Sequence, residues 1–430
     1  MEKLIFHNNL LNESNYIYTH SSGLKIIITP KPGFSKTTVM FGTNFGSVYN
    51  NYFDNKTQKT VTFPDGIAHF LEHKLFESED GDAFSKYAKT GASANAYTSF
   101  NNTVYYFTCT DKVKENIKIL TDLMQTPYFT EQNVKKEQGI IGQEINMYLD
   151  NPDWRVYFNM LTAMYSVNPV KIDIAGSVES ISKITPEMLY DCYSKFYSGE
   201  NMAISVCGDV DPDDIADYIN TLLYKIEDTA DITVDFPEEP IDVHQSYITQ
   251  KLDVSIPIFN IGYKNDNINL SGKDYAKLCC IGKISLDILF GKSSSFYNDM
   301  YNKGYINDSF GTEFSCEKQF VNSIISGESE HINELVSEIE KTIMFFTHNS
   351  IPENEFSRQI KKLKSNYIKL FNNLETISRF AMECYFNKHN ILDHIEIVDS
   401  ITQSDIDAFI KTLTNDKKVV SVILPKDTEN

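Results

Sequence analysis

The stretch from His69 to His73, HFLEH, combines two histidines and a glutamate, residue types that can bind a metal ion and transfer protons. Its two imidazoles stand four residues apart, so on a helix they share one face, and Glu72 projects from the same side. Imidazoles bind zinc, and a carboxylate beside them can act as a general base toward a zinc-activated water. The order reverses the commoner HExxH, but it indicates the same metal-assisted hydrolysis. Nine histidines in 430 residues can also fall four apart by chance, so the surrounding sequence must decide.

The residues around this motif predict a helix with one apolar face. Pro64–Gly66 is a helix-start signal, and Ile67, Leu71 and Leu75 recur four apart on the side opposite the histidines. Two histidines are too few for a catalytic zinc, which normally takes three protein ligands and keeps one position for water. A third ligand must therefore come from elsewhere in the chain.

A second helical pattern, from Glu131 to Tyr148, carries two candidates for that ligand. Glu137 and Glu144 lie seven residues apart on one face of it. Either carboxylate could reach the metal, and the other could orient a ligand or balance charge. The alternative is a pair of solvated glutamates, which is the usual state of Glu on a helix.

HFLEH followed by EQGIIGQE resembles the paired motifs of the pitrilysin/insulinase family of zinc peptidases, which are inverzincins. The resemblance implies that His69, His73 and Glu144 bind one Zn²⁺ ion. It further implies that Glu72 is the catalytic base and that Glu137 is the carboxylate that supports the ligands from behind.

The likeness continues in GASANAYTSF (91–100) and in IDIAGSVESISKIT (172–185). The first of these segments resembles the family's edge strand beside the zinc helix. The resemblance therefore implies that a peptide substrate adds to this edge as a further strand, held at Ala94, Asn95 and Ala96.

The length of 430 residues predicts more than one domain. The segment 228–245 is acidic, contains two prolines and has no helical periodicity, which is typical of a linker. We therefore predict a zinc-bearing catalytic domain at 1–227, a linker at 228–245 and a second domain at 246–430.

The two predicted domains look like copies of one another. The pattern of residues 184–206 returns at 401–422. By this offset, Ile284–Leu289 takes the place of the zinc helix and contains no histidine, while Gln359 and Asn366 take the places of the two glutamates. The second copy is therefore expected to be metal-free.

Short strand patterns and long helices indicate an α+β fold. Strands are predicted at Leu24–Ile28, Thr37–Phe41 and Tyr97–Thr110, the last as a hairpin that turns at 101–102. Long helices are predicted at Asp111–Gln125, Glu131–Tyr148, Asp211–Leu223, Glu330–Phe346 and Glu353–Asn372. We expect two homologous domains, each a mainly antiparallel sheet packed with helices, and the resemblance implies a clam-like arrangement of the two.

One departure from the family concerns the groups that hold the substrate. The family usually has an Arg and a Tyr near the start of its last domain, but the matching stretch here, 293–310, contains no arginine. The chain's three arginines, Arg155, Arg358 and Arg379, lie elsewhere, and Tyr305 is a candidate remnant. Such groups commonly contribute a few kcal/mol of transition-state stabilisation. Because relatives of the mitochondrial processing-peptidase type divide this labour, we predict a heterodimer with a similar-sized partner subunit that supplies the missing pair.

Composition bounds the other partners and the location. A net charge of −20 argues against nucleic acid or an anionic membrane as a partner. The seven cysteines include no CxxC pair, which favours free thiols in a reducing compartment. No stretch approaches 18 apolar residues, so we expect a cytoplasmic protein. His389 and His394, five apart in KHNILDH, are expected to be solvated.

The sequence thus favours a zinc metalloendopeptidase that hydrolyses peptides or unfolded precursors. One alternative is a non-catalytic scaffold or peptide-binding subunit that retains a relic zinc site. Another is a metal-binding protein without hydrolysis, which would not need Glu72.

Overall fold

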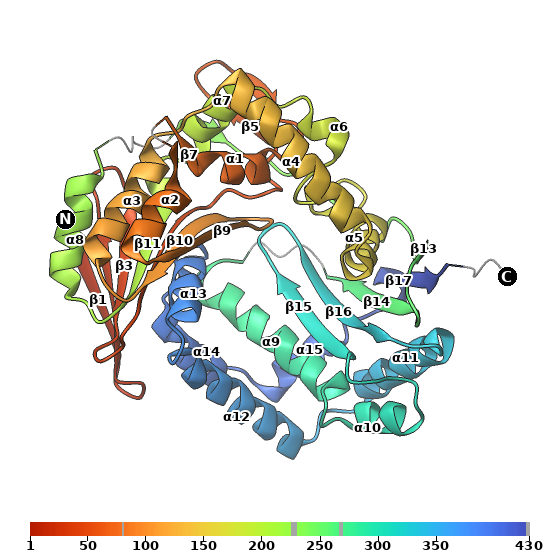
Figure 1. Ribbon diagram of the computed structural model, residues 1–430. Coiled ribbons are helices and arrows are strands. Elements are labelled where there is room, and N and C mark those ends of the chain that lie inside the picture. Colours follow the sequence, from red (N-terminus) through yellow and green to blue (C-terminus); the bar gives the residue numbers. More distant parts are fainter. Residues whose placement is uncertain (80, 225–229, 266–269, 427–430) are drawn as a thin grey trace. The chain divides into compact units, whose positions relative to one another are not determined.

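The computed structural model describes residues 1–79, 81–224, 230–265 and 270–426, and the chain divides into two compact units (Figure 1). Unit 1 consists of Met1–Ile145, Asp173–Asp235 and Ile368–Asp393, and unit 2 consists of Asn146–Ile172, Phe236–Tyr367 and His394–Asn430. The units therefore differ from the continuous ranges 1–227 and 246–430 predicted from the sequence. Of the predicted linker, residues 228 and 229 lie outside the described residues, and the remainder divides between the units after Asp235.

Unit 1 is built on a seven-stranded sheet in the order β1-β2-β3-β11-β4-β10-β9. The strands are β1 (Glu2–Asn8), β2 (Glu13–Thr19), β3 (Lys25–Pro30), β11 (Met202–Gly208), β4 (Thr37–Thr43), β10 (Thr103–Cys109) and β9 (Ser93–Thr98). Strands β3 and β11 pair in parallel, and the other neighbours are antiparallel. The apolar runs of β3 and β11 suit central positions that helices cover on both faces. Strand β9 lies at the edge and pairs only with β10 among the described strands.

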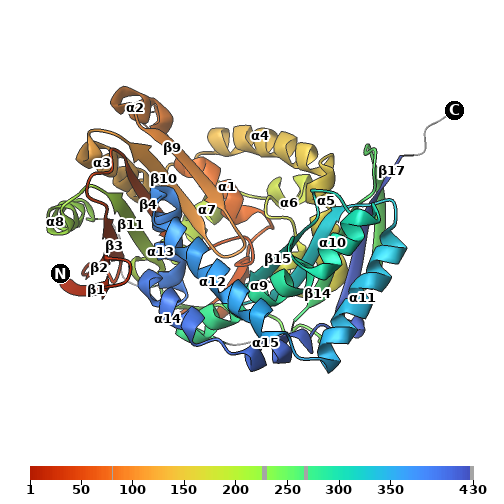
Figure 2. The same cartoon turned by 90° about the horizontal axis from the view of Figure 1, so that it is seen from below.

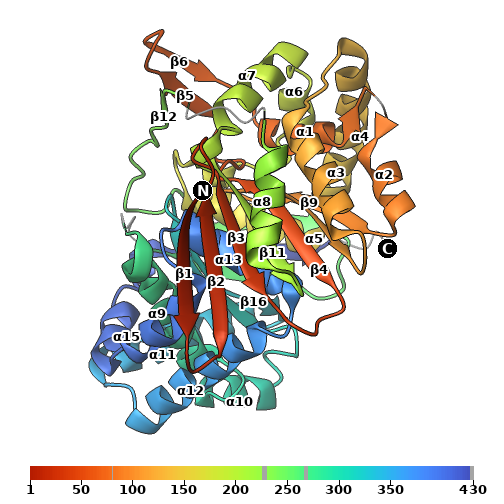
Figure 3. The same ribbon diagram turned by 90° about the vertical axis from the view of Figure 1, so that its left-hand side faces the viewer.

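Helices cover both faces of this sheet. On one face lie α3 (Val113–Gln125) and α8 (Pro212–Leu222), which cross in front of the strands in Figure 3. The other face is covered by α13 (Leu374–Phe386), which contacts β11, β4 and β3 although it comes from much later in the chain (Figure 2). Asn373 caps α13 by accepting a hydrogen bond from the Thr376 N–H.

Unit 1 also contains further α-helices and small strands outside the large sheet. They are α1 (Ile67–Leu75), α2 (Ala83–Thr90), α6 (Val178–Ile181), α7 (Pro186–Phe196), the three-stranded sheet of β12 (Ile232–Thr233), β5 (Asn51–Asp54) and β6 (Lys59–Thr62), and the hairpin of β7 (Glu77–Ser78) and β8 (Gly81–Asp82). Helix α4 (Glu131–Leu149) belongs to unit 1 as far as Ile145.

Unit 2 is built on a five-stranded sheet in the order β13-β17-β14-β16-β15. The strands are β13 (Tyr247–Leu252), β17 (Lys418–Pro425), β14 (Ile258–Lys264), β16 (Val321–Glu328) and β15 (Gly311–Cys316). Helix α5 (Pro152–Met164) packs on β17, β14 and β13, and α9 (Gly272–Phe290) packs on β15 (Figure 1). The other helices are α10 (Ser295–Asn302), α11 (Ile332–His348), α12 (Glu353–Leu370, which crosses the unit boundary), α14 (His394–Asp399) and α15 (Gln403–Ile410).

The two sheets share one topology. Strands β3-β11-β4-β10-β9 of unit 1 correspond in order and direction to β13-β17-β14-β16-β15 of unit 2, and each set contains one parallel pair. Each sheet is also covered by a helix that is distant in sequence from most of its unit: α13 comes from late in the chain and packs in unit 1, and α5 comes from earlier in the chain and packs in unit 2.

These features confirm the predicted α+β fold with two mainly antiparallel sheets, and the shared topology supports the internal repeat. The clam-like arrangement stays a prediction. Among the described residues, no helix is long and apolar enough to span a membrane.

Candidate metal centre

Helix α1 starts at a close contact between two backbone segments of unit 1. Gly66 precedes its first turn with φ +90°, and a Cβ there would lie 2.4 Å from the carbonyl oxygen of Ala175. Gly176 has φ +74°, and its Cβ would lie 2.4 Å from the carbonyl oxygen of Asp65. The Ser180 hydroxyl also donates to that oxygen at 2.8 Å. Only glycine fits both positions, since positive φ and close approach exclude a side chain. This contact fixes where α1 begins.

The three motif residues lie on α1 as the sequence predicts. His69 and Glu72 are 9% and 8% exposed, while the side chain of His73 is 26% exposed. Ile67 and Leu71 on the apolar face are buried, as expected. The buried setting means that the polar atoms of the motif depend on protein partners or a ligand for their interactions.

Glu144 on α4 reaches both histidines. Its Oε1 lies 3.7 Å from Nε2 of His69, and its Oε2 lies 3.5 Å from Nε2 of His73. One ligand atom from each of the three residues lies within 4.8 Å of the other two. Four ligands around tetrahedral zinc, at bonds of about 2.0–2.2 Å, stand roughly 3.3–3.6 Å apart. The donor set and its spacing therefore fit a zinc ion.

Glu137, one of the two candidates for the third ligand, lies behind His73. Its Oε1 is 3.1 Å from Nδ1 of His73, the ring nitrogen that does not face Glu144. A carboxylate in this place accepts the Nδ1 proton, orients the ring and leaves Nε2 free for a metal. In contrast, Nδ1 of His69 is buried without a hydrogen-bond partner among the described residues.

The electrostatics of the group favour a cation. Burial, together with the neighbouring His73, lowers the pKa of His69 to about 3, so its imidazole is neutral near pH 7. Burial also lowers the pKa of His73, but Glu137, Glu72 and Glu144 outweigh it, and the net effect is a raised pKa. The carboxylates that attract a proton to His73 would equally attract a metal ion, which competes for the same nitrogen.

Glu72 is held by the edge strand. The hydroxyl of Thr98, the last residue of β9, donates to its Oε2 at 2.6 Å. Burial raises the pKa of Glu72, and the Thr98 hydrogen bond and His73 partly oppose that rise. A carboxylate with a raised pKa binds a proton more readily, which is the property of a general base that works near neutral pH.

The predicted substrate-binding residues also lie on β9. Asn95 is exposed, and Ala94 and Ala96 are half-buried. Because side chains alternate along a strand, both alanines share the Thr98 face, and Tyr97 lies on the opposite face. The Arg379 guanidinium of α13 lies over the Tyr97 ring, 5.5 Å from its centroid.

The other two arginines, Arg155 and Arg358, belong to unit 2, and so does Tyr305. The Tyr305 ring stacks on the His331 ring with the two ring centroids 4.6 Å apart.

Two residues near the site were missed in the sequence. Thr98 gives no local signal, because its role depends on the pairing that places β9 beside α1. Lys74, which follows His73, is fully buried. It lies three residues after Leu71 and seven after Ile67, on the apolar face, and a lysine in that register is a signal that could have been noticed.

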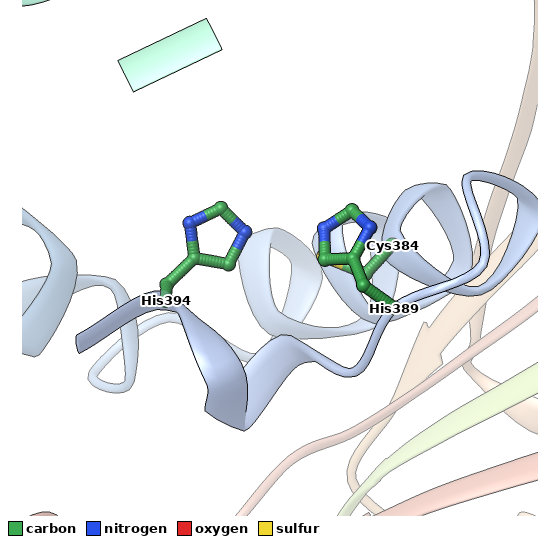
Figure 4. A group of neighbouring side chains, drawn as sticks. All are labelled: Cys384, His389 and His394. Atoms are coloured by element: carbon green, nitrogen blue, oxygen red, sulfur yellow. The ribbon is translucent and has the colours of Figure 1, made fainter. Parts of the chain in front are cut away.

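The prediction for the second histidine pair is corrected by burial. Cys384 lies on α13, His389 follows in the turn after it, and His394 is the first residue of α14 (Figure 4). His394 is 8% exposed and stacks on Tyr367, so the prediction that it is solvated is wrong. His389 is partly buried, and burial lowers its pKa.

Comparison with known proteins identifies the family of this chain. The family model described as "Insulinase (Peptidase family M16)" matches residues 62–178, and the model described as "Peptidase M16 inactive domain" matches 183–363. The "Uncharacterized zinc protease YmfH" of Bacillus subtilis (strain 168) is 39% identical over 97% of this chain and 98% of its own length. The chain belongs to the M16 peptidase family.

The chain is also similar to other known proteins in sequence and in structure. An M16-like peptidase from Alicyclobacillus acidocaldarius has a crystal structure that superposes with a TM-score of 0.93, at 32% identity over 96% of this chain and 99% of that chain. The mitochondrial-processing peptidase subunit beta of Dictyostelium discoideum is 24% identical over 93% of this chain and 86% of that protein. The family resemblance drawn from HFLEH and EQGIIGQE is confirmed.

Proposed function

We propose that this M16 protein is a zinc metallopeptidase in which His69, His73 and Glu144 bind the metal and Glu72 is the general base. The observation that carries the proposal is the approach of Glu144 to Nε2 of both histidines, at 3.7 and 3.5 Å. Zinc bound by such ligands lowers the pKa of a water molecule to about 7 and polarises the substrate carbonyl.

The surrounding residues prepare this chemistry. Glu72 takes the proton of the attacking water and returns it to the leaving amine, and Thr98 fixes the direction of its carboxylate. His69 is neutral and therefore ready to bind a metal, while Glu137 orients His73. Burial of Glu72 and Glu137 keeps water away from the hydrogen bonds that hold these two carboxylates.

We propose further that the peptide binds as an added strand along β9. Its outer edge has no strand partner among the described residues, and its last residue bonds the proposed base. A peptide there would present alternate side chains to the face of Ala94 and Ala96 and to the face of Tyr97. N-methylation of successive peptide bonds in a substrate tests this mode. Binding to the Glu72→Gln variant should weaken at every second position, and a uniform effect along the peptide would refute strand addition.

The proposed general base is tested by Glu72→Gln. The peptidase reading expects peptide cleavage to fall by several orders of magnitude while one zinc per chain is retained. Glu131→Gln, an exposed glutamate at the start of α4, is the matched control and should change neither quantity. Unchanged cleavage in Glu72→Gln would overturn the assigned role.

The alternative is a non-catalytic subunit that keeps a relic zinc site. That reading expects zinc in the wild-type protein but no cleavage of any peptide, and it expects Glu72→Gln to behave like the wild type. The retention of all three ligands and of Glu72 favours the enzyme.

We propose that a partner subunit completes the active enzyme as a heterodimer. The support is the absence of arginine from 293–310 and the likeness to a protein named as one subunit of a processing peptidase. Cleavage should be measured with the chain alone and with a co-purified partner. Equal activity in both samples would remove the need for a partner. The cytoplasmic location expected from the sequence stays a prediction.

A further inference from the structure

Lys74, the residue directly after the second histidine of the motif, has no exposed surface. An ammonium group taken out of water is costly unless carboxylates or other acceptors surround it. Two carboxylates do so here: Oε2 of Glu77 lies 2.5 Å from Nζ, and Oε2 of Glu137 lies 3.6 Å from it. A lysine beside the motif is thus enclosed with two acidic partners, one of which also contacts His73.

Glu137 divides its two oxygens between these neighbours. Oε1 faces Nδ1 of His73 at 3.1 Å, and Oε2 faces Nζ of Lys74 at 3.6 Å. The Glu137 side chain is only 7% exposed, so water offers little to either oxygen. If the ammonium were absent, Oε2 would lose its charged neighbour, and the carboxylate would be free to rotate or to move toward solvent.

We propose that Lys74 is a positioning residue that holds Glu137 against His73 and thereby strengthens zinc binding, an inference that rests on the proposed zinc site. The chain of contacts runs from the Lys74 ammonium through the Glu137 carboxylate to the His73 imidazole. Its effect is to keep the proton of His73 on Nδ1, so that the Nε2 lone pair is directed at Glu144 and the metal. Lys74 touches neither the metal nor the substrate.

A structural ion pair is the competing account, and stability does not separate the two. Removing one partner of a buried pair is destabilising whatever else the pair does. Zinc affinity and the tautomer of His73 do separate them, because a merely structural lysine would change neither in a folded protein.

The test is Lys74→Met, which keeps the length of the side chain and removes its charge. Zinc affinity is measured by competition with a chromophoric chelator, and ¹⁵N NMR of the metal-free protein at alkaline pH reports which His73 nitrogen carries the proton. We expect zinc to bind 10- to 100-fold more weakly, the usual effect of removing a residue that supports a ligand. We also expect the Nδ1–H form of His73 to give way to a mixture.

Lys118→Met is the control, because Lys118 is a 55% exposed lysine paired with Asp122 on α3. It should leave both readouts unchanged. If Lys74→Met does not fold, the double variant Lys74→Met/Glu77→Gln removes both charges of the shorter pair and keeps the net charge of the site. The same loss of affinity is expected in that background.

The outcomes distinguish this proposal from the proposed function. Wild-type zinc affinity and an unchanged His73 tautomer in a folded Lys74 variant would overturn the positioning role and leave the peptidase proposal standing. The opposite outcome is a wild-type protein that binds zinc but cleaves no peptide, together with a Lys74→Met variant that binds zinc more weakly. This result would overturn the peptidase proposal and support the role of Lys74. A wild-type protein that binds no zinc overturns both.

Discussion

Glu239→Gln should destabilise unit 2 by about 3 kcal/mol, although Glu239 lies in the segment that the sequence predicts to be a linker. Its carboxylate accepts the backbone N–H groups of residues 166–168 at 2.7, 2.9 and 2.7 Å. The Lys264 ammonium lies 2.8 Å from its Oε1, and both side chains are only 5% exposed. The predicted linker is thus anchored to unit 2 by a buried ion pair and three further hydrogen bonds.

The magnitude follows from what the amide cannot replace. Three backbone N–H groups and an ammonium now donate to the two oxygens of a carboxylate. Gln replaces one of these oxygens with an NH₂ group, which cannot accept, and leaves the other oxygen without charge. Breaking a buried pair typically costs about 3–5 kcal/mol. Lys264 also donates to the carbonyl oxygens of Met164, Pro240 and Asp242, so it is left partly satisfied. The lower end of that range, about 3 kcal/mol, is therefore expected.

The assay uses the chain's single tryptophan, Trp154, which belongs to unit 2 and stacks on Tyr148 with the ring centroids 4.4 Å apart. Its emission during urea unfolding follows the unit that contains Glu239. The matched control is Glu238→Gln, an exposed neighbour, which should shift the transition by less than about 0.5 kcal/mol. A loss below about 1 kcal/mol in Glu239→Gln would refute the anchoring argument.

The same pair gives a pH dependence with a definite sign. Burial opposes ionisation of Glu239, but the hydrogen bonds from Lys264 and from residues 166–168 outweigh it and hold its pKa below the ordinary 4.5. A lowered pKa in the folded state means that the stabilisation is fully present above about pH 4.5 and is lost as the pH falls through the folded-state value. The difference between wild type and Glu239→Gln should therefore be constant at neutral pH and shrink below that point.

Three further predictions concern unit 1. Glu144→Gln should weaken zinc binding by more than about 100-fold in chelator competition, because it removes a ligand rather than a supporting residue; near-normal affinity would exclude Glu144 as a ligand. Thr98→Val removes the hydrogen bond that lowers the pKa of Glu72, so the acid limb of the kcat/KM profile should move to higher pH, and an unmoved limb would contradict this role. Gly66 has a φ of +90°, and a Cβ there would lie 2.4 Å from a backbone oxygen, so Gly66→Ala should lower the free energy of unfolding by about 1–3 kcal/mol. The control Gly139→Ala, in open space on α4, should raise it by about 0.5–1 kcal/mol. Both are measured by urea unfolding followed by circular dichroism, and equal effects would refute the close contact at α1.

Helix α1 and its partner α4 could be predicted because their signals are local. HFLEH places three functional groups on one face by helical spacing alone, and EQGIIGQE does the same for Glu137 and Glu144. The spacing leaves open which glutamate is the ligand. In the structure Glu144 faces both Nε2 atoms and Glu137 faces Nδ1 of His73, and the proposal of Glu144 as the ligand depends on this difference in orientation.

Features that depend on distant segments could not be predicted. Lys74 falls in the apolar register of α1, but one of the two carboxylates around its ammonium, Glu137, comes from α4 and cannot be inferred from the local sequence. The acidic, proline-containing segment around Glu239 has the composition of a linker, yet backbone groups of residues 166–168 bind it. The packing of α5 on the sheet of unit 2 and of α13 on the sheet of unit 1 likewise cannot be predicted from the order of the elements along the chain.

The strand order of the two sheets has a consequence for synthesis on the ribosome. In each sheet, an interior strand is the last one to be made: β11 enters between β3 and β4, and β17 enters between β13 and β14. Until that strand emerges, the earlier strands beside it expose backbone N–H and C=O groups without partners, and such edges pair readily with other chains. In unit 2 the earlier strands stay unpaired along this edge until β17, at Lys418–Pro425, has been made. Nascent chains that stall before this strand are therefore the forms most exposed to aggregation and most dependent on chaperones.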